Sequence, residues 1–142
     1  MHHKIADIYD AAQEIALLFG SREINGACCD DLSFVEFMAL KKIHEHRTFT
    51  IQEIGRALKF TKSGATRIID RLEDRGYVTR QTSPRDGRVC CVTCSARGTK
   101  AISKAAAKYT RFFKAILQEM ESEQVEQIRR ALKTLALAVR KR

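Results

Sequence analysis

The sequence predicts a mostly α-helical protein with one small β-hairpin, a winged helix-turn-helix flanked by N- and C-terminal helices. Three observations predict this fold class. Apolar residues recur at helical spacing through most of the chain. The single proline, Pro84, leaves long stretches free to be helical. Two short β-like runs are joined by turn-forming residues. The chain has 142 residues, which suits one domain with its own core.

The first predicted helix runs from Ile5 to Phe19. Its apolar residues recur every three or four positions and form one stripe. Gly20 is a suitable C-terminal cap because glycine tolerates the left-handed conformation found there. Residues 21–31 are expected to form a loop.

Two capping boxes predict the next two helices. Ser33 and Glu36 have the required spacing, in which each side chain satisfies the free backbone N–H of the other residue. Thr50 and Glu53 repeat the pattern. We therefore expect a helix after Ser33 and a short helix from Thr50 to about Lys59.

A fourth helix is expected to begin after Thr61, a good N-cap residue, and to stop at Gly76. Helical spacing places four apolar residues on its buried face: Ala65, Ile68, Ile69 and Leu72. The exposed face then carries Asp70 and four hydroxyl or cationic side chains: Lys62, Ser63, Thr66 and Arg67.

These exposed side chains favour DNA as a partner. The net charge of +9 and the pI of about 9.6 indicate a polyanionic ligand, although a basic, solvated surface is an alternative interpretation. Arg67 is expected to contact a base edge, because a guanidinium can bind guanine O6 and N7 together. Lys62, Ser63 and Thr66 suit phosphate or base contacts near the helix N-terminus.

The predicted hairpin consists of Tyr77–Thr82 and Arg88–Cys94, joined by a turn at positions 83–87. Arg85 and Arg88 lie at or beside its tip, where an arginine can enter the negative minor groove of DNA. Asp86 is interpreted as a brace that pairs with a neighbouring arginine and fixes the loop. The alternative is that Asp86 is simply a turn former.

From Ala96 onward the pattern is helical again, with a break at Glu121-Ser122. The terminal helices, 1–20 and 99–142, carry apolar stripes that one small domain can hardly cover. The economical solution is a dimer in which these helices pack against their mates.

The five cysteines are expected to be reduced thiols rather than a disulfide framework. Cys91 and Cys94 have metal-ligand spacing. However, alternation along a strand points them apart and leaves Cys90 and Cys94 about 13 Å from each other. We therefore interpret Cys90 and Cys94 as small core residues, and Cys91, if exposed, as the more reactive thiol.

The vicinal pair Cys28-Cys29 lies in the predicted loop, where both thiols could meet a soft metal, an arsenical or an oxidant. A site shared between this pair and a thiol of the hairpin is a further hypothesis. A disulfide within the pair is disfavoured, because its geometry is strained.

The stretch between the fourth helix and the one after the hairpin resembles the MarR family of transcriptional regulators. The matching residues are Leu72-Glu73-Asp74-Arg75-Gly76-Tyr77-Val78, Arg80, Asp86-Gly87-Arg88 and Gly98. The resemblance covers nearly the whole chain. It implies one MarR-like domain over 1–142, with a winged helix-turn-helix core at 32–98. Cys94 departs from the pattern, since the family usually carries a larger apolar residue there.

The resemblance also implies a homodimer that binds a pseudo-palindromic operator in double-stranded DNA. The recognition helix would cover Thr61 to Arg75, and Arg88 would be the wing arginine. Ligands of this family often sit between the dimerisation helices and the winged helix-turn-helix.

The leading hypothesis is a repressor that a small molecule of unknown identity releases from DNA. The alternatives are a thiol-based redox or soft-metal sensor on the same scaffold, and a protein-interaction winged helix without DNA binding. No catalytic constellation points to an enzyme, and no cofactor is predicted. The sequence shows neither a signal peptide nor a membrane-spanning run, so a cytoplasmic protein is expected.

Overall fold

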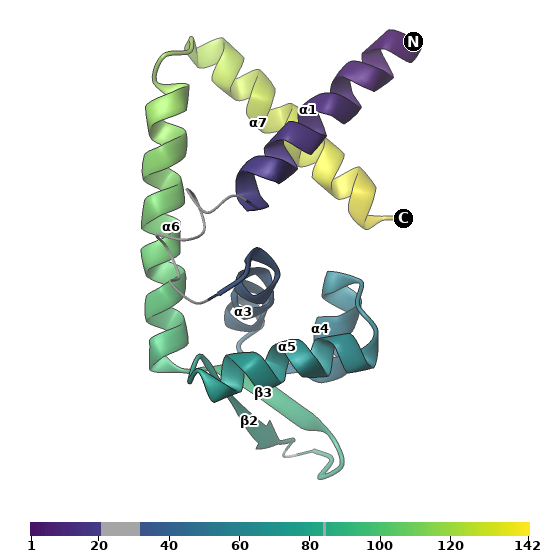
Figure 1. Cartoon of the computed structure of the whole chain (residues 1–142), viewed down its shortest axis with the longest axis vertical. Coiled ribbons are helices and arrows are strands. Elements are labelled where there is room, and N and C mark those ends of the chain that lie inside the picture. The colour runs from purple at the N-terminus through teal and green to yellow at the C-terminus, as the bar shows by residue number, and fades with distance from the viewer. Residues whose placement is uncertain (21–31, 84) are drawn as a thin grey trace. The chain divides into compact units, whose positions relative to one another are not determined.

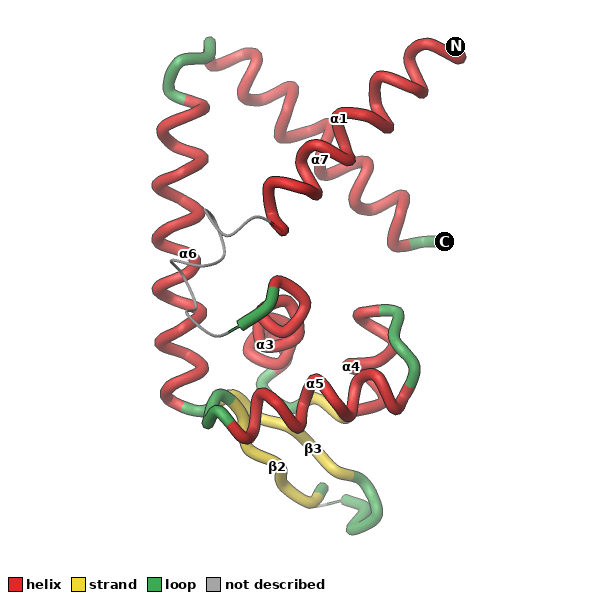
Figure 2. The backbone as a smooth tube through the Cα atoms, in the orientation of Figure 1, coloured by secondary structure: helices red, strands yellow, loops and turns green. Residues whose placement is uncertain are grey.

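The computed structural model describes residues 1–20, 32–83 and 85–142, which contain six helices and three strands. The helices are α1 (His2–Gly20), α3 (Phe34–His46), α4 (Ile51–Leu58), α5 (Lys62–Asp74), α6 (Ala96–Leu117) and α7 (Ser122–Arg140). The strands are β1 (Phe49–Thr50), β2 (Val78–Thr82) and β3 (Cys90–Cys94). The predicted fold class, mostly helical with a small antiparallel sheet, is confirmed (Figures 1 and 2).

The chain divides into two compact units, Met1–Ala106 and Ala107–Arg142. The first unit holds the helix-turn-helix and the sheet. Its largest fully buried side chains come from α3, α4, α5 and both hairpin strands: Leu40, Ile43, Ile54, Ile69, Leu72, Val78 and Val92. The hairpin of β2 and β3 extends beyond α5, as a wing does (Figure 1).

Both predicted capping boxes are present. The backbone N–H of Ser33 donates to Glu36 at 2.9 Å, and the backbone N–H of Glu36 donates to the Ser33 hydroxyl at 3.2 Å. Thr50 and Glu53 exchange equivalent bonds at 2.8 and 3.1 Å. These local contacts set the starts of α3 and α4 independently of the rest of the fold.

The sheet has a third strand that the sequence analysis missed. β1 pairs antiparallel with β3, with Phe49 opposite Val92 and Thr50 opposite Cys91, so that β3 is the middle strand. β1 is only two residues long, and Thr50 is also the N-cap of α4. A strand of this length has no periodicity to detect.

The two terminal helices expose apolar side chains. In α1, Ile5, Ile8 and Ile15 are 59%, 57% and 43% exposed. In the second unit, α7 has no buried residue, although Leu132, Leu135 and Val139 recur at near-heptad spacing. Within the part of the chain that the structure describes, no helix is long and apolar enough to cross a bilayer.

The start of α6 is fixed tightly against the end of α5 and the start of the hairpin. The Ser95 hydroxyl donates to the carbonyl of Gly76 at 2.6 Å and accepts from the backbone N–H of Gly98 at 3.0 Å. A Cβ at position 98 would lie 2.2 Å from the Tyr77 carbonyl oxygen and 2.6 Å from the Cys94 sulfur. Only glycine allows this approach.

We therefore expect Gly98→Ala to lower the free energy of unfolding by about 2–3 kcal/mol, because backbone must move to admit the methyl group. Urea denaturation followed by circular dichroism measures this change. Gly87→Ala is the matched control, since a Cβ there meets only Thr82 Cγ2 at 4.0 Å. Equal stability of the two variants would contradict the close packing at position 98.

Candidate nucleic-acid interface

The exposed face of α5 brings four predicted site residues together. Thr61 caps the helix, its hydroxyl accepting from the backbone N–H of Gly64 at 3.1 Å. Burial of Ala65, Ile69 and Leu72 fixes the rotation of the helix about its axis. The opposite face is left to solvent, where four side chains line one shallow, open hollow: Lys62, Ser63, Thr66 and Arg67.

This hollow offers cations and hydroxyls at the start of a helix. The Thr66 hydroxyl donates to the carbonyl of Lys62 at 2.8 Å, so that its oxygen is left to accept from a ligand. Lys62, Ser63 and Arg67 are exposed. The positive end of the helix dipole lies at the same place. Such a surface suits phosphate oxygens and the acceptor-rich edges of bases.

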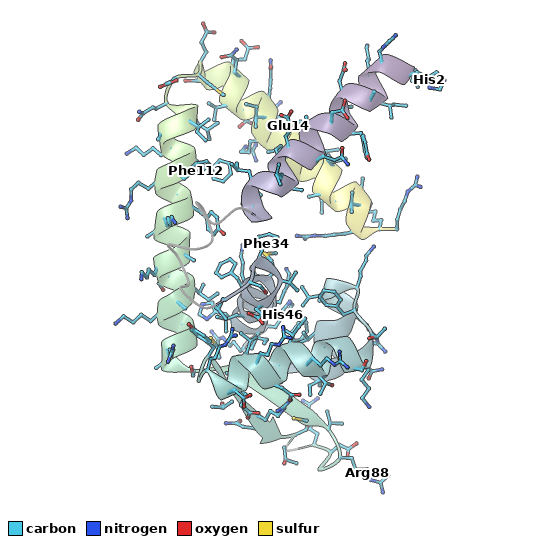
Figure 3. The ribbon with its side chains drawn as sticks, in the orientation of Figure 1. His2, Glu14, Phe34, His46, Arg88 and Phe112 are labelled. Carbon is cyan, nitrogen blue, oxygen red and sulfur yellow. The ribbon has the colours of Figure 1, made fainter. Side chains whose placement is uncertain are left out.

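The wing presents its two predicted arginines to solvent. Arg85 and Arg88 are exposed, and Figure 3 shows Arg88 pointing away from the sheet at the hairpin tip. The tip is closed by a bond from the Ser83 N–H to the Val89 carbonyl at 2.8 Å. Pro84 of the predicted turn lies outside the described residues.

Asp86 fixes the wing tip through the backbone rather than through an arginine side chain. Its carboxylate accepts from the backbone N–H of Arg88 at 3.0 Å, and its carbonyl accepts from the N–H of Val89 at 3.0 Å. Among the described residues, the ion pairs of this region belong to Arg80. The turn-former interpretation of Asp86 therefore holds, and the predicted arginine pair is corrected.

Arg80 connects the wing to α5, a role that the sequence analysis did not assign. From β2, its guanidinium pairs with the carboxylates of Asp70 and Glu73 on α5. Its backbone N–H also donates to Glu73 at 3.3 Å. The hydrogen bond to Asp70, followed by that to Glu73, raises the pKa of Arg80 above its usual value. The arginine stays charged at any physiological pH.

A second set of ion pairs holds α5 against α3. Glu36 is the buried charged residue of the core, and its side chain is only 5% exposed. It accepts from Arg71, on the last turn of α5, at 3.4 Å and from Arg75, the C-cap residue just after α5, at 3.1 Å. The sequence analysis identified Glu36 only as a capping residue. Glu36 lies 35 and 39 residues before the two arginines in the chain, so no local sequence pattern predicts these ion pairs.

Cys91 was predicted to be the more reactive thiol if it were exposed, but it is buried. Its residue surface is 7% exposed, whereas Cys90 and Cys94 are half-buried. Cys90 and Cys94 were predicted as small core residues, but burial along β3 does not alternate, and the adjacent Cys91 and Val92 are both buried. The missed strand β1 places Thr50 beside Cys91 on one side, and β2 places Gln81 on the other.

The remaining described thiols are poorly suited to bind a metal ion or to react with an oxidant. Burial raises the pKa of Cys94, against a smaller opposing effect of its hydrogen bond from Thr99, so that less thiolate forms at neutral pH. Among the described residues, no group of three His, Cys, Asp or Glu side chains could hold a metal ion. Cys28 and Cys29 lie outside the described residues.

Comparison with known proteins shows which family the winged helix-turn-helix resembles. The family model described as the MarR family matches residues 32–90, which span α3 to the start of β3. Over this region the chain is similar to MarR family regulators. The HTH-type transcriptional regulator YhbI of Bacillus subtilis is 24% identical over 100 residues, 70% of this chain and 65% of YhbI. The chain thus spans just under two thirds of that relative.

One further relative and two solved structures are similar to this chain. The organic hydroperoxide resistance transcriptional regulator of B. subtilis is 26% identical over 74% of this chain and 70% of its own length. FabT of Streptococcus pneumoniae in complex with DNA superposes with a TM-score of 0.83 at 18% identity, covering 99% of both chains. A MarR variant from Escherichia coli with operator DNA gives 0.75 at 19% identity, over 95% of this chain and 97% of that one.

We expect Glu36→Gln to lower the free energy of unfolding by about 1–2 kcal/mol, because a neutral amide cannot replace the charge that faces Arg71 and Arg75. Chemical denaturation gives the change. Glu45→Gln is the control, since the pair of Glu45 with Lys42 at 3.1 Å is exposed and contributes at most about 0.5 kcal/mol. Equal losses in the two variants would show that the buried pairs add nothing.

Proposed function

We propose that this protein is a member of the MarR family and a sequence-specific, DNA-binding regulator of transcription. The observation that carries the proposal is the exposed face of α5, whose four polar and cationic residues lie in the same compact unit as an arginine-tipped wing. The DNA complexes of FabT and of the E. coli MarR variant, which share the fold, support the same reading of this surface.

In this proposal α5 lies in the major groove of double-stranded DNA. The groove is about 12 Å wide, and a helix with its side chains is about 10–12 Å across. Arg67 contacts a base edge, and Lys62, Ser63 and Thr66 contact phosphates or bases. Arg85 and Arg88 of the wing reach the adjacent minor groove, where the potential is most negative.

The regulator acts as a homodimer on a pseudo-palindromic operator. The support is the apolar surface that α1 and α7 each expose, which a second copy of the chain could cover. Two copies related by a twofold axis would present two α5 helices to half-sites about one helical turn apart.

We further propose that the protein is a repressor and that a small molecule releases it from DNA. A ligand can do this only if it binds more tightly to a conformation in which the two α5 helices no longer fit successive grooves. A thiol-based trigger is not favoured by the described thiols, because Cys91 is buried and Cys94 is less acidic than a free cysteine.

Selection of bound fragments from genomic DNA supplies the operator, and two substitutions then separate the roles of α5 and the wing. Arg67→Ala should reduce discrimination between the operator and a duplex with one altered base pair by about 1–3 kcal/mol. Arg88→Ala should weaken binding to operator and unrelated duplex alike, and should lower the salt slope by about 0.9. Fluorescence anisotropy at several salt concentrations measures both effects.

Fragments without a shared motif would contradict sequence-specific binding. Unchanged discrimination in Arg67→Ala would place that side chain away from the bases. Unaltered affinity in Arg88→Ala would remove the wing from the interface.

A further inference from the structure

Helix α6 is charged with one sign only. It carries six cationic side chains and no Asp or Glu, although the chain as a whole has 17 acidic residues. We call these six residues the α6 basic face: Arg97, Lys100, Lys104, Lys108, Arg111 and Lys114. None of them belongs to the interface described above.

The six cations lie along one side of the helix. At about 3.6 residues per turn their spacing confines them to an arc of about 120° over about 26 Å of helix. Buried Gly98 and Ala105 of α6 occupy the other side. Lys100, Lys104, Arg111 and Lys114 are exposed, and no ion pair of the described residues involves these four.

The like charges of this face destabilise α6 when no anion is bound to it. Lys100 and Lys104 are four residues apart, as are Lys104 and Lys108, and like charges at this spacing destabilise a helix. An ordinary solvated helix relieves this repulsion with acidic residues, as Glu126 does beside Arg129 and Arg130 in α7. Helix α6 has no acidic residue of its own to do this, and an anion bound to Lys100 and Lys104 would relieve their repulsion.

The side of α6 opposite these cations favours a phosphate backbone over a membrane surface as their partner. Helices that bind lipid combine a basic face with large apolar side chains on the opposite face, which insert between the lipids. On the side of α6 away from the cations, Gly98 and Ala105 are buried in the protein, so this side of the first turns is not available to lipid. Binding to the phosphates of duplex DNA requires only the positive charges, because each neutralised phosphate releases a counterion.

The start of α6 lies away from the surface proposed to hold the operator. Arg97 comes just after β3, at the end of the strand opposite the wing tip, and its guanidinium lies 4.7 Å from the centre of the Tyr77 ring. The first turns of α6 belong to the same compact unit as α5 and the sheet, and they leave the sheet at that end (Figure 1). A duplex seated on α5 and the wing tip therefore leaves Lys100 and Lys104 available.

We propose that the α6 basic face binds the phosphate backbone of a second DNA duplex while α5 and the wing hold the operator. This inference rests on the proposed function, because it takes the first duplex to occupy α5. The second contact is independent of base sequence, and it would let one regulator join two segments of DNA.

The test uses full-length protein saturated with unlabelled operator and measures its binding to a labelled duplex of unrelated sequence. The variant Lys100→Gln, Lys104→Gln, Arg111→Gln removes three charges from the α6 basic face. The matched control, Lys4→Gln, Lys41→Gln, Lys133→Gln, removes three exposed charges elsewhere and gives the same net charge. Circular dichroism confirms that both variants fold, as expected for exposed positions.

We expect both variants to bind operator like the wild type. The α6 variant should bind the second duplex at least about tenfold more weakly, with a salt slope lower by about 2.7, and the control should match the wild type. The inference is overturned if operator-loaded wild type does not bind the second duplex, or if the two variants weaken its binding equally. It is also overturned if the α6 variant loses binding only to vesicles of anionic lipid.

Failure of the two proposals can be told apart. A wild type that does not prefer operator over unrelated duplex contradicts the proposed function. In that case the two variants are compared without operator, and their binding to unrelated duplex still decides the role of the α6 basic face. A wild type that binds operator but no second duplex contradicts only this inference.

Discussion

The orientation of α5 is the constraint on which the candidate DNA-binding surface depends. Buried Ala65, Ile69 and Leu72 set which face of the helix meets solvent. Glu36 holds its last turns against α3, and Arg80 joins its Asp70 and Glu73 to the wing. Among the described residues, the ion pairs of α5 thus lie on its C-terminal half, which leaves the cations of the first turns available to a polyanion.

The charge of the molecule is distributed unevenly for a physical reason. Where cations have a structural role, as at Arg71, Arg75 and Arg80, carboxylates lie within bonding distance. In the described part of the chain, exposed cations without such a carboxylate lie on the first turns of α5, at the wing tip, and at Lys100, Lys104, Arg111 and Lys114 of α6. Part of the net charge of +9 therefore lies on surfaces that can meet DNA.

Local features of the fold could be predicted from the sequence because they act over three or four residues. The capping boxes at Ser33 and Thr50, and the apolar spacing of α5, are of this kind. Contacts between distant segments could not be predicted. The two-residue strand β1 buries Cys91, and Glu36 meets arginines more than thirty residues away. The burial of the hairpin thiols could not be predicted from alternation, because it depends on the elements that lie beside β3.

The same distinction applies to the candidate site. Lys62, Ser63, Thr66 and Arg67 were predicted as one surface, since helical periodicity alone brings them together. Asp86 was recognised as a determinant of the wing tip, but whether it bonds to backbone or to a side chain depends on loop geometry. Arg80 was visible only as part of a family pattern. Its role requires the register that places β2 beside α5.

The most direct test of this account is a double-mutant cycle for operator binding with Arg80→Met and Asp70→Asn. If the ion pairs of Arg80 hold the wing and α5 as one DNA-binding unit, the two substitutions should be coupled by at least about 0.5 kcal/mol of binding free energy, because either one already breaks the shared contact. Two losses that simply add would contradict the claim that this contact orients the DNA-binding surface.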